Sequence, residues 1–386
     1  GTMSAAAQIY VGEARFIARK KIIKELLEKG SLTKEEEYTT RLGYSQRTGV
    51  VVEPRISTQW FVKMKELAEP ALKAVVDGDI KIHPGDKFLA TYKYWLENVK
   101  DWCISRQLWW GQQIPAWYDA EGRMVVAETK EEALEKFKTH PVNSGTKIKI
   151  EEIRQDADVL DTWFSSWLWP TQVFKGITEP GNEEVKYYYP GSVLVTGQDI
   201  IFFWVARMVM AGMEYEKQIP FKDVYFTGMV RDKLGRKMSK SLGNSPDLLD
   251  LIDKYGADAV RFGIMVSSPA GNDLMFDENT LEQGRNFNNK IWNALKLLRM
   301  WEGRQSVVGS KEWADSSFAI DWFDNRLNKV RAEVDLLMKL FRLSEALKTI
   351  YSLIWDDFCS WYLEWVKPDF EKPIAKGVYE KTIYFF

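Results

Sequence analysis

The most constraining feature of this sequence is a short basic segment, Lys237-Met238-Ser239-Lys240-Ser241, that follows an apolar run. The run Val224-Tyr225-Phe226 is β-branched and aromatic and predicts a strand. The connection between them, residues 228–236, is rich in glycine and charge and predicts an exposed loop. Two ammonium groups three residues apart are suited to hold a polyphosphate, because they stabilise negative charge that develops during phosphate chemistry. A solvated loop without a ligand is the alternative interpretation.

A second segment, residues 193–208, has a similar order of elements. Val193-Leu194-Val195 predicts a short strand, the next four residues predict a turn, and residue 200 begins a helix. Open α/β sheets place nucleotide sites at such strand–turn–helix junctions. Gly197 could let a ligand approach the backbone or only permit a tight turn. Asp199 could bind ribose hydroxyls or cap the helix, and the residues by themselves favour capping.

Other candidate residues permit two interpretations each. Asp158 and Asp161 could serve acid–base chemistry or bind magnesium, but surface or capping roles are the simpler expectation. Ile200 and Trp204 share one helix face and could line a pocket or belong to the core. The run 102–111 is aromatic, is expected to be mostly buried, and contains an arginine, Arg106, that needs a partner.

Composition limits the class of protein. The chain has 386 residues, enough for about two or three domains. Its net charge of −2 excludes a general basic field, so any RNA contact must come from local patches. The two cysteines and two histidines are isolated, which excludes a Cys/His zinc site and favours a reducing compartment. No apolar stretch of about 20 residues predicts a membrane span.

The periodicity of the apolar residues predicts an α/β part followed by an all-α part. Residues 14–29 are expected to form an amphipathic helix, and residues 49–52 a short strand. Residues 119–156 are polar, contain a predicted helix at 130–138, and are interpreted as a peripheral insertion. From residue 287 onward, apolar residues recur at steps of three and four, which is typical of a helical bundle.

The string Lys-Met-Ser-Lys-Ser-Leu-Gly-Asn at residues 237–244 resembles the second signature of class I aminoacyl-tRNA synthetases. Within that class, the amino-acid sequences of several further segments are most similar to those of the valine-specific members. These segments are residues 12–20, 57–64, 102–111, 158–166 and 197–208. The resemblance implies the second half of a Rossmann-like nucleotide-binding domain with insertions, followed by part of a helical anticodon-binding domain.

The resemblance also implies roles for particular residues. Lys237 and Lys240 would be catalytic, because in this class they stabilise the leaving pyrophosphate. The residues implied to bind ATP are Gly197, Asp199, Lys237, Met238, Ser239 and Lys240. Those implied to shape the amino-acid pocket are Trp163, Ile200 and Trp204.

The implied reaction joins valine to ATP as valyl-adenylate and transfers the acyl group to tRNA(Val). Magnesium would accompany ATP, but no dedicated protein ligand for a metal is visible and zinc is not expected. The resemblance further implies a cytoplasmic, monomeric parent enzyme that does not bind membranes. Two alternatives remain open: an isoleucine-specific synthetase of the same class, and a non-catalytic module that binds tRNA.

The domain limits expected from the resemblance are 1–58, 59–240, 241–285 and 286–386. The first comprises a tag remnant, Gly1-Thr2-Met3, and the closing edge of an editing insertion. The others are the catalytic part, a stem-contact segment and the start of the anticodon-binding part. The His-x-Gly-His signature of the class does not occur in this sequence. We therefore expect the chain to be a fragment and to be essentially inactive without the half that carries this signature.

Overall fold

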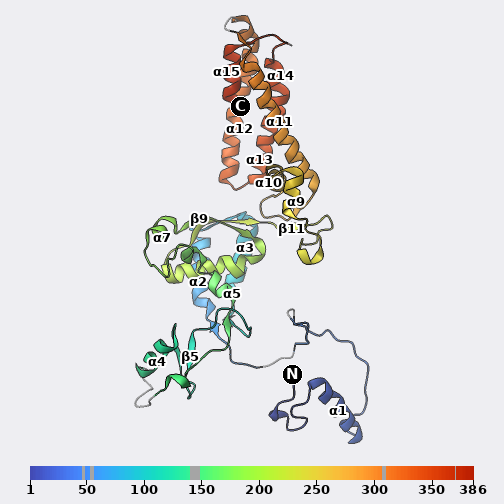
Figure 1. Ribbon diagram of the computed structural model, residues 1–386, viewed down its shortest axis with the longest axis vertical. Helices are drawn as coiled ribbons and strands as arrows, with labels where there is room; N and C mark the ends of the chain where they lie inside the picture. Colours follow the sequence, from blue (N-terminus) through green and yellow to red (C-terminus); the bar gives the residue numbers. More distant parts are fainter. Residues whose placement is uncertain (46–47, 53–55, 140–147, 307–309, 370) are drawn as a thin grey trace. The chain divides into compact units, whose positions relative to one another are not determined.

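The computed structural model describes residues 1–386 except 46–47, 53–55, 140–147, 307–309 and 370 (Figure 1). The chain divides into two compact units, Gly1–Thr58 and Gln59–Phe386. The domain limits expected from the sequence stay predictions. Within the described residues, no helix combines the length and apolarity required to span a membrane.

The first unit contains helix α1 (Arg15–Glu28), which confirms a helix in the predicted range. Its predicted apolar face is not buried, because Ile17, Leu26 and Leu27 are exposed. Residues at the start of the chain pair with the segment before α1, since Thr2 forms a β-bridge with Ala14 and the N–H of Met3 donates to the carbonyl of Glu13. The prediction of a strand at 49–52 was wrong. These residues, which the structure describes, form no strand, and Val51 makes a single isolated β-bridge, with Tyr44.

The second unit contains a parallel three-stranded sheet in the order β2-β10-β9. Its strands are β2 (Lys81–His83), β10 (Phe221–Thr227) and β9 (Gly191–Gly197), and the last two confirm the predicted strands. Thr227 pairs with Gly197 in register. Because parallel strands end at the same edge of a sheet, the two candidate nucleotide-binding segments begin side by side.

Helices α2 (Met64–Val76), α3 (Gly85–Glu97) and α8 (Arg207–Ala211) pack with this sheet around one core. The regular helix predicted from residue 200 differs from what is observed. A 3₁₀ turn at Gln198–Ile200 leads into a π-helix at Ile201–Ala206, and a second π-helix follows α8 at Gly212–Glu216. The wide π-turn lets two adjacent phenylalanines stack on different tryptophans, Phe202 on Trp95 and Phe203 on Trp163.

The described part of the insertion predicted at 119–156 forms a small substructure together with residues 116–118. Antiparallel strands β5 (Ala116–Tyr118), β6 (Met124–Val126) and β7 (Arg154–Gln155) pack with helix α4 (Lys130–Thr139). The insertion has a core of its own, which includes Trp117, Ala133, Phe137 and Ile153. It therefore does not depend on the main sheet for its packing.

The run 102–111 is only half buried, which corrects the expectation. Strands β3 (Trp102–Cys103) and β4 (Ser105–Arg106) pair with β1 (Phe61–Val62) and β8 (Val159–Leu160) and are partly or fully buried. Trp109 and Trp110 follow β4 in a bend and are fully exposed. The aromatic content of the run was mistaken for burial, because sequence does not show where the strand ends.

The described elements that follow residue 240 are mainly helical, with three short strands among them. Helices α9 (Leu248–Tyr255) and α10 (Ala257–Val266) follow the basic segment, and short strand β12 (Leu274–Met275) precedes helix α11 (Glu278–Glu302). The expected boundary between residues 285 and 286 therefore falls inside α11. The elements after α11 are β13 (Gln305–Ser306), α12 (Ser310–Lys339), α13 (Leu343–Ser352), a π-helix at Leu353–Tyr362, α14 (Leu363–Val366), β14 (Ile374–Ala375) and α15 (Lys376–Phe385). Earlier in the chain, the short helices α6 (Trp169–Gln172) and α7 (Glu183–Tyr188) precede β9.

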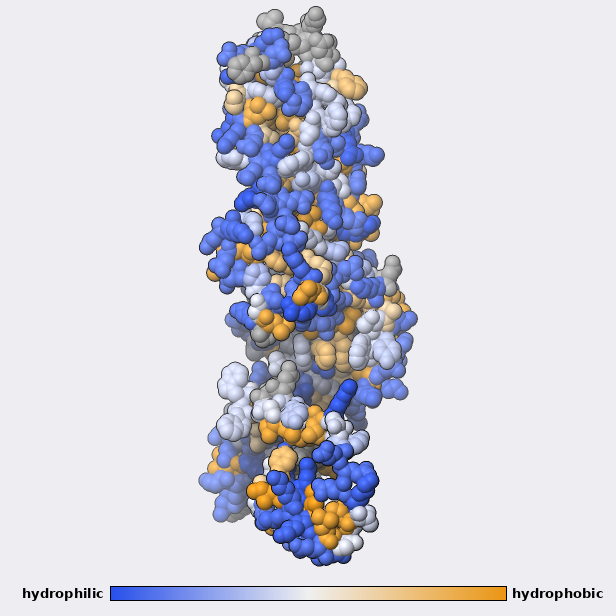
Figure 2. All heavy atoms as spheres, turned by 90° about the vertical axis from the view of Figure 1, so that its right-hand side faces the viewer, coloured by the Kyte–Doolittle hydropathy of each residue, from blue (hydrophilic) through white to orange (hydrophobic). Residues whose placement is uncertain are grey.

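These helices confirm the predicted bundle. Its core includes Leu298, Phe323, Val330 and Tyr362, which are almost inaccessible to solvent. The surface of the bundle in Figure 2 is mostly hydrophilic with scattered hydrophobic patches, as the periodicity predicted. Phe341 departs from that periodicity, because it lies beyond the end of α12 in a left-handed conformation.

Candidate active site

The chain runs from β10 to Lys237 through a tight hairpin. Strand β11 (Val230–Arg231) pairs with β12, and Arg231 also forms a bridge with Lys237. Gly228 is required at the start of the hairpin, because a Cβ atom there would lie 1.6 Å from the backbone oxygen of Asn272. The predicted exposed basic loop is thus attached to the segment before β12.

Asp232 and Asn244 hold the hairpin closed. The Asp232 carboxylate accepts hydrogen bonds from the backbone N–H groups of Leu234 and Arg236 at 3.0 and 2.9 Å. It also accepts from Asn244 Nδ2 at 3.0 Å and Arg236 Nε at 2.8 Å. The Asn244 bond and the Arg236 guanidinium hold the pKa of Asp232 well below its ordinary value. Asn244 Oδ1 accepts from the N–H of Ser239 at 2.9 Å, so one amide fixes both sides of the loop.

The two predicted catalytic lysines lie on the exposed side of this loop. Lys237 Nζ lies 3.6 Å from Asp199 Oδ2, and both side chains are about half exposed. Lys240 is exposed and begins a 3₁₀ turn, Lys240–Leu242, that the Ser239 hydroxyl caps by accepting the N–H of Leu242 at 3.3 Å. Met238 donates its N–H to the carbonyl of Val230 at 3.1 Å. The structure therefore brings the basic loop and the turn after β9 together.

The turn after β9 presents Asp199 to this loop. The N-cap positions of the 3₁₀ turn and of the π-helix are Gly197 and Ile200, so the preference for Asp199 as a helix cap was wrong. The φ of Gly197 is −69°, which any residue can adopt. A Cβ atom at Gly197 would instead lie 2.7 Å from Asp199 Oδ1. A side chain at position 197 would therefore displace the Asp199 carboxylate, which folds back over Gly197.

Sequence reasoning missed Asp273, which lies between the turn and the loop. Its Oδ1 accepts from Gln198 Nε2 and from the N–H of Met229, both at 3.0 Å, and its Oδ2 pairs with Arg231. The guanidinium of Arg231 and the hydrogen bond from the N–H of Met229 lower the pKa of Asp273. The sequence before it, Pro269-Ala270-Gly271, indicates a turn but gives no sign of the residues that meet there.

Two of the three residues predicted to shape the amino-acid pocket meet at helix α5 (Thr162–Ser166): Trp163 lies within it and Trp204 bonds to its last residue. Trp204 donates Nε1–H to the carbonyl of Ser166 at 3.0 Å and lines an apolar pocket with Trp169 and Val195. Trp163 stacks on Phe203, with ring centroids 5.9 Å apart. Ile200 ends the 3₁₀ turn and is partly buried. The pocket role of the three residues together stays a prediction.

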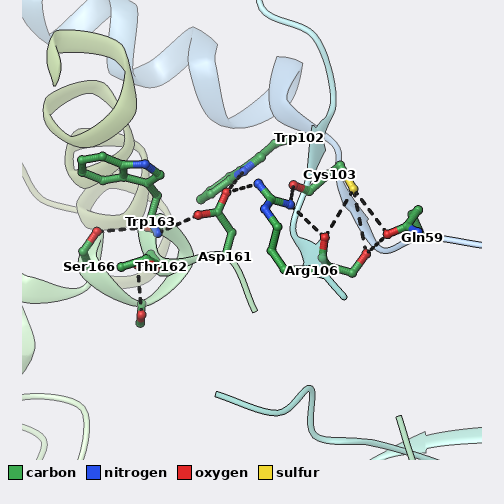
Figure 3. A network of polar contacts seen from close by, with 10 residues as sticks. Gln59, Trp102, Cys103, Arg106, Asp161, Thr162, Trp163 and Ser166 are labelled. Atoms are coloured by element: carbon green, nitrogen blue, oxygen red, sulfur yellow. Dashed lines mark hydrogen bonds and ion pairs between the residues drawn. The ribbon is translucent and has the colours of Figure 1, made fainter. Parts of the chain in front are cut away.

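Asp161 positions Trp163 and provides the partner that Arg106 was expected to need (Figure 3). One Asp161 oxygen accepts the N–H of Trp163 at 3.0 Å and so caps α5. The other accepts Trp102 Nε1–H at 3.1 Å and pairs with Arg106. Asp158 accepts from Gln107 Nε2 at 2.7 Å. Both carboxylates are therefore engaged in capping and side-chain contacts, in agreement with the simpler expectation.

Arg207 is an unusual buried cation on the far side of Trp102. Its side chain is 5% exposed, and its guanidinium carbon lies 3.5 Å from the centroid of the Trp102 ring. Burial lowers the pKa of Arg207 to about 10, although the charge of Asp161 opposes this shift. Among the residues that the structure describes, neither Nε nor Nη1 of Arg207 has a hydrogen-bond partner.

Metal-binding residues do not gather elsewhere in the described part of the chain. No group of three or more His, Cys, Asp or Glu side chains in those ranges has the geometry to hold a metal ion. Cys103 and Cys359 are both free thiols.

Most of the chain matches known protein families. Residues 12–277 match the family described as tRNA synthetases class I (I, L, M and V). Residues 321–386 match the anticodon-binding domain of tRNA ligases. The first match covers well over half of the chain and includes both the Asp199 turn and the Lys237 loop.

Similar proteins have been named valine–tRNA ligases. The Phocaeicola vulgatus protein is 58% identical over the whole chain, and the Bacteroides fragilis protein is 57% identical over the whole chain. The interpretation of residues 1–3 as a tag remnant stays a prediction. The chain spans 43% and 44% of the length of these two relatives.

Solved structures with a similar fold are methionyl-tRNA synthetases from Mycobacterium tuberculosis. The complex with methionyl-adenylate is 19% identical, with a TM-score of 0.60, and the likeness covers 89% of this chain and 60% of that one. At this identity the likeness shows the fold. A second structure, bound by methionyl-adenylate, has a TM-score of 0.58. The chain belongs to the class I tRNA synthetases of the I, L, M and V family and combines part of their catalytic domain with an anticodon-binding domain.

Proposed function

We propose that this chain forms part of a valine–tRNA ligase that activates valine with ATP and transfers it to tRNA(Val). The observation that carries the proposal is the approach of Lys237 to Asp199, which joins the two segments that the family resemblance assigns to ATP. The names of the relatives, at 57–58% identity, support valine as the amino acid.

In the proposed reaction the carboxylate of valine attacks the α-phosphate of ATP and pyrophosphate leaves. Lys237 and Lys240 bind the leaving phosphates and stabilise the charge that develops on them. Asp199 accepts hydrogen bonds from the ribose hydroxyls, and Gly197 leaves room for its carboxylate. Lys237 exchanges its contact with Asp199 for the phosphates when ATP binds. Magnesium accompanies ATP as part of the substrate.

The proposed valine slot is formed by Trp163, Ile200 and Trp204. Trp163 is fixed by the N–H bond to Asp161, and Trp204 by its bond to the carbonyl of Ser166. A pocket held this rigidly excludes the additional methylene of isoleucine by steric overlap. Rejecting a smaller side chain is harder, since one methylene is worth only about 1–3 kcal/mol of binding.

The helical bundle is proposed to bind the anticodon part of tRNA(Val), because residues 321–386 match that domain family. We also propose a monomeric parent enzyme in the cytoplasm. The two free thiols are consistent with a reducing compartment.

The test compares analogues of valyl- and isoleucyl-adenylate. They are titrated against a full-length hybrid in which this chain replaces the matching stretch of the Phocaeicola vulgatus relative, with the unmodified relative as the control. We expect the valyl analogue to bind at least tenfold more tightly, which corresponds to about 1.4 kcal/mol. Tighter binding of the isoleucyl analogue would overturn the choice of valine. Salt-dependent tRNA binding with neither analogue bound would favour a non-catalytic module instead.

A further inference from the structure

We propose that Asp273 is a positioning residue that fixes the ribose turn, residues 197–199, relative to the lysine loop, residues 228–240. This inference rests on the proposed function, which assigns both segments to ATP. Asp273 itself lies outside both, in a segment from residue 271 to residue 275 that we call the edge segment.

The edge segment contacts the residues that come directly after each of the three parallel strands. After β2, a Cβ atom at Gly271 would lie 2.7 Å from Pro84 Cγ, and Lys87 donates to the carbonyl of Gly271 at 2.5 Å. After β10, Gly228 lies directly against the backbone of Asn272. After β9, Gln198 bonds to Asp273. One short stretch of chain therefore sets the relative positions of all three strand ends.

Within this segment Asp273 is the residue that joins the turn to the loop. A single oxygen, Oδ1, accepts one hydrogen bond from Gln198 of the turn and one from Met229 of the loop. The other oxygen pairs with Arg231, whose Nη1 donates to the carbonyl of Gly235 at 3.1 Å. The contact thus extends from Asp273 to the tip of the hairpin that precedes Lys237.

The charge of Asp273 strengthens this arrangement. Hydrogen bonds to an ionised carboxylate are about twice as strong as those between neutral groups, and Asp273 accepts three such contacts from separate residues. Its lowered pKa keeps it ionised at neutral pH. A reactive geometry for phosphate chemistry requires the ribose and the pyrophosphate to be held in fixed relation, and small displacements cost large factors in rate. Asp273 supplies that relation without touching either group.

The first experiment measures amide hydrogen exchange in the 386-residue chain and in three variants. Asp273→Ala removes all three contacts, and Asp273→Asn keeps an oxygen acceptor but loses the charge. Asn272→Ala is the matched control, because it removes one contact to Lys87 and leaves Asp273 in place. We expect Asp273→Ala to accelerate exchange about tenfold or more in both segments, the factor expected for a lost hydrogen bond to a charged group. Asp273→Asn should give a smaller increase, and the control none.

Two results would overturn the proposal: faster exchange only in residues 272–276, or faster exchange in the lysine loop without any change in the ribose turn. Either result would mean that Asp273 supports only its own surroundings and does not join the turn to the loop. Unchanged exchange in β10 verifies that each variant is folded. If Asp273→Ala does not fold, exchange in Asp273→Asn is compared with exchange in Asn272→Ala instead. The proposal then requires faster exchange in both the turn and the loop of Asp273→Asn.

The second experiment measures valine-dependent ATP–pyrophosphate exchange in the full-length hybrid. Asp273→Ala is expected to raise KM for ATP about tenfold or more while KM for valine changes less than twofold, because the valine slot lies elsewhere. A rise in both KM values, or in neither, would contradict a role in positioning ATP. If the unsubstituted hybrid shows no exchange activity, the proposed function fails, whereas the hydrogen-exchange result still decides whether Asp273 joins the two segments.

Discussion

At the scale of single residues, the site is a set of charged groups held by neighbours that are distant in sequence. Lys237 meets Asp199 across 38 positions, and Asp273 meets Gln198 across 75. Local sequence indicates which residue types suit phosphate chemistry, but these pairs depend on how the sheet is assembled. The positions of Lys237 and Asp199 are compatible with their predicted roles, and the roles themselves stay predictions.

The Asp232 carboxyl is expected to titrate far below the ordinary aspartate value of 3.8. A carboxyl whose pKa is lowered by folding stabilises the folded loop above its unfolded pKa, and this contribution is lost only as the pH falls through the lower folded value. The hairpin should therefore remain closed at pH 4. Titration of ¹³C-labelled aspartate by NMR measures the pKa directly. Asn244→Ala should raise the pKa of Asp232. An ordinary pKa for Asp232 in the unsubstituted chain would contradict the observed hydrogen bonds to its carboxylate.

Arg207 is expected to be replaceable by a side chain of similar volume without loss of stability. Replacing a buried charge by a well-packed apolar group is often neutral or stabilising. Arg207→Met should therefore leave the free energy of unfolding within about 1 kcal/mol of the original or raise it, whereas Arg207→Ala should lower it by about 2 kcal/mol or more through the cavity it creates. Urea denaturation of both variants provides the measurement. A loss of clearly more than about 1 kcal/mol for Arg207→Met, relative to the unsubstituted chain, would show that the stacking of the guanidinium on Trp102 is stabilising.

The sequence indicates residue types that suit the proposed chemistry, but it does not indicate their immediate partners. Asp199 was expected to cap a helix, because aspartate before a helix usually does, yet the 3₁₀ turn places it beyond the cap position. Asp273 carried no signal, since an aspartate after a glycine turn is common and its three partners come from two other segments. Contacts of this kind arise from tertiary structure and leave no local pattern.

At the scale of elements, prediction succeeded where apolar periodicity is strong. Strands β9 and β10 and the long helices of the bundle were expected, because each buries a regular set of apolar residues. The π-helix after β9 was not expected, since its i to i+5 pattern over six residues is too short to distinguish from α-helical spacing. The strand at 49–52 failed because β-branched residues indicate a strand only when a partner strand is present.

The hairpin that carries Lys237 is expected to depend on one glycine. Gly228→Ala would force a Cβ atom into the backbone of Asn272, and overpacking of this kind costs up to about 3 kcal/mol. Gly235→Ala is the matched control in the same hairpin. Nothing lies within 4 Å of the position that a Cβ atom at residue 235 would take. Gly235→Ala should therefore lower the free energy of unfolding only through its φ of +76°, by about 1–2 kcal/mol. Equal losses of stability on denaturation would mean that the close approach at Gly228 is not maintained in solution.

At the scale of the whole molecule, the chain joins part of a class I catalytic domain to an anticodon-binding domain, and it spans less than half the length of its relatives. Contacts between the two parts include the stacking of Phe341 on His83, with ring centroids 4.2 Å apart. The sequence predicted both parts but not this contact, because apolar periodicity assigns Phe341 to the inner face of the bundle. The inactivity expected for the 386-residue chain by itself stays a prediction.

The Lys237 loop and the Asp199 turn are proposed to form together the ATP site of a valine-specific enzyme. Valine-dependent ATP–pyrophosphate exchange in the full-length hybrid tests it most directly. Lys237→Ala and Lys240→Ala should each reduce the exchange rate about a hundredfold or more, as expected for groups that stabilise transition-state charge. Lys233→Ala, in the same loop but paired with Asp277 at 3.4 Å, should leave the rate within about twofold. Equal losses for all three lysines, or an unchanged rate for Lys237→Ala, would contradict the account.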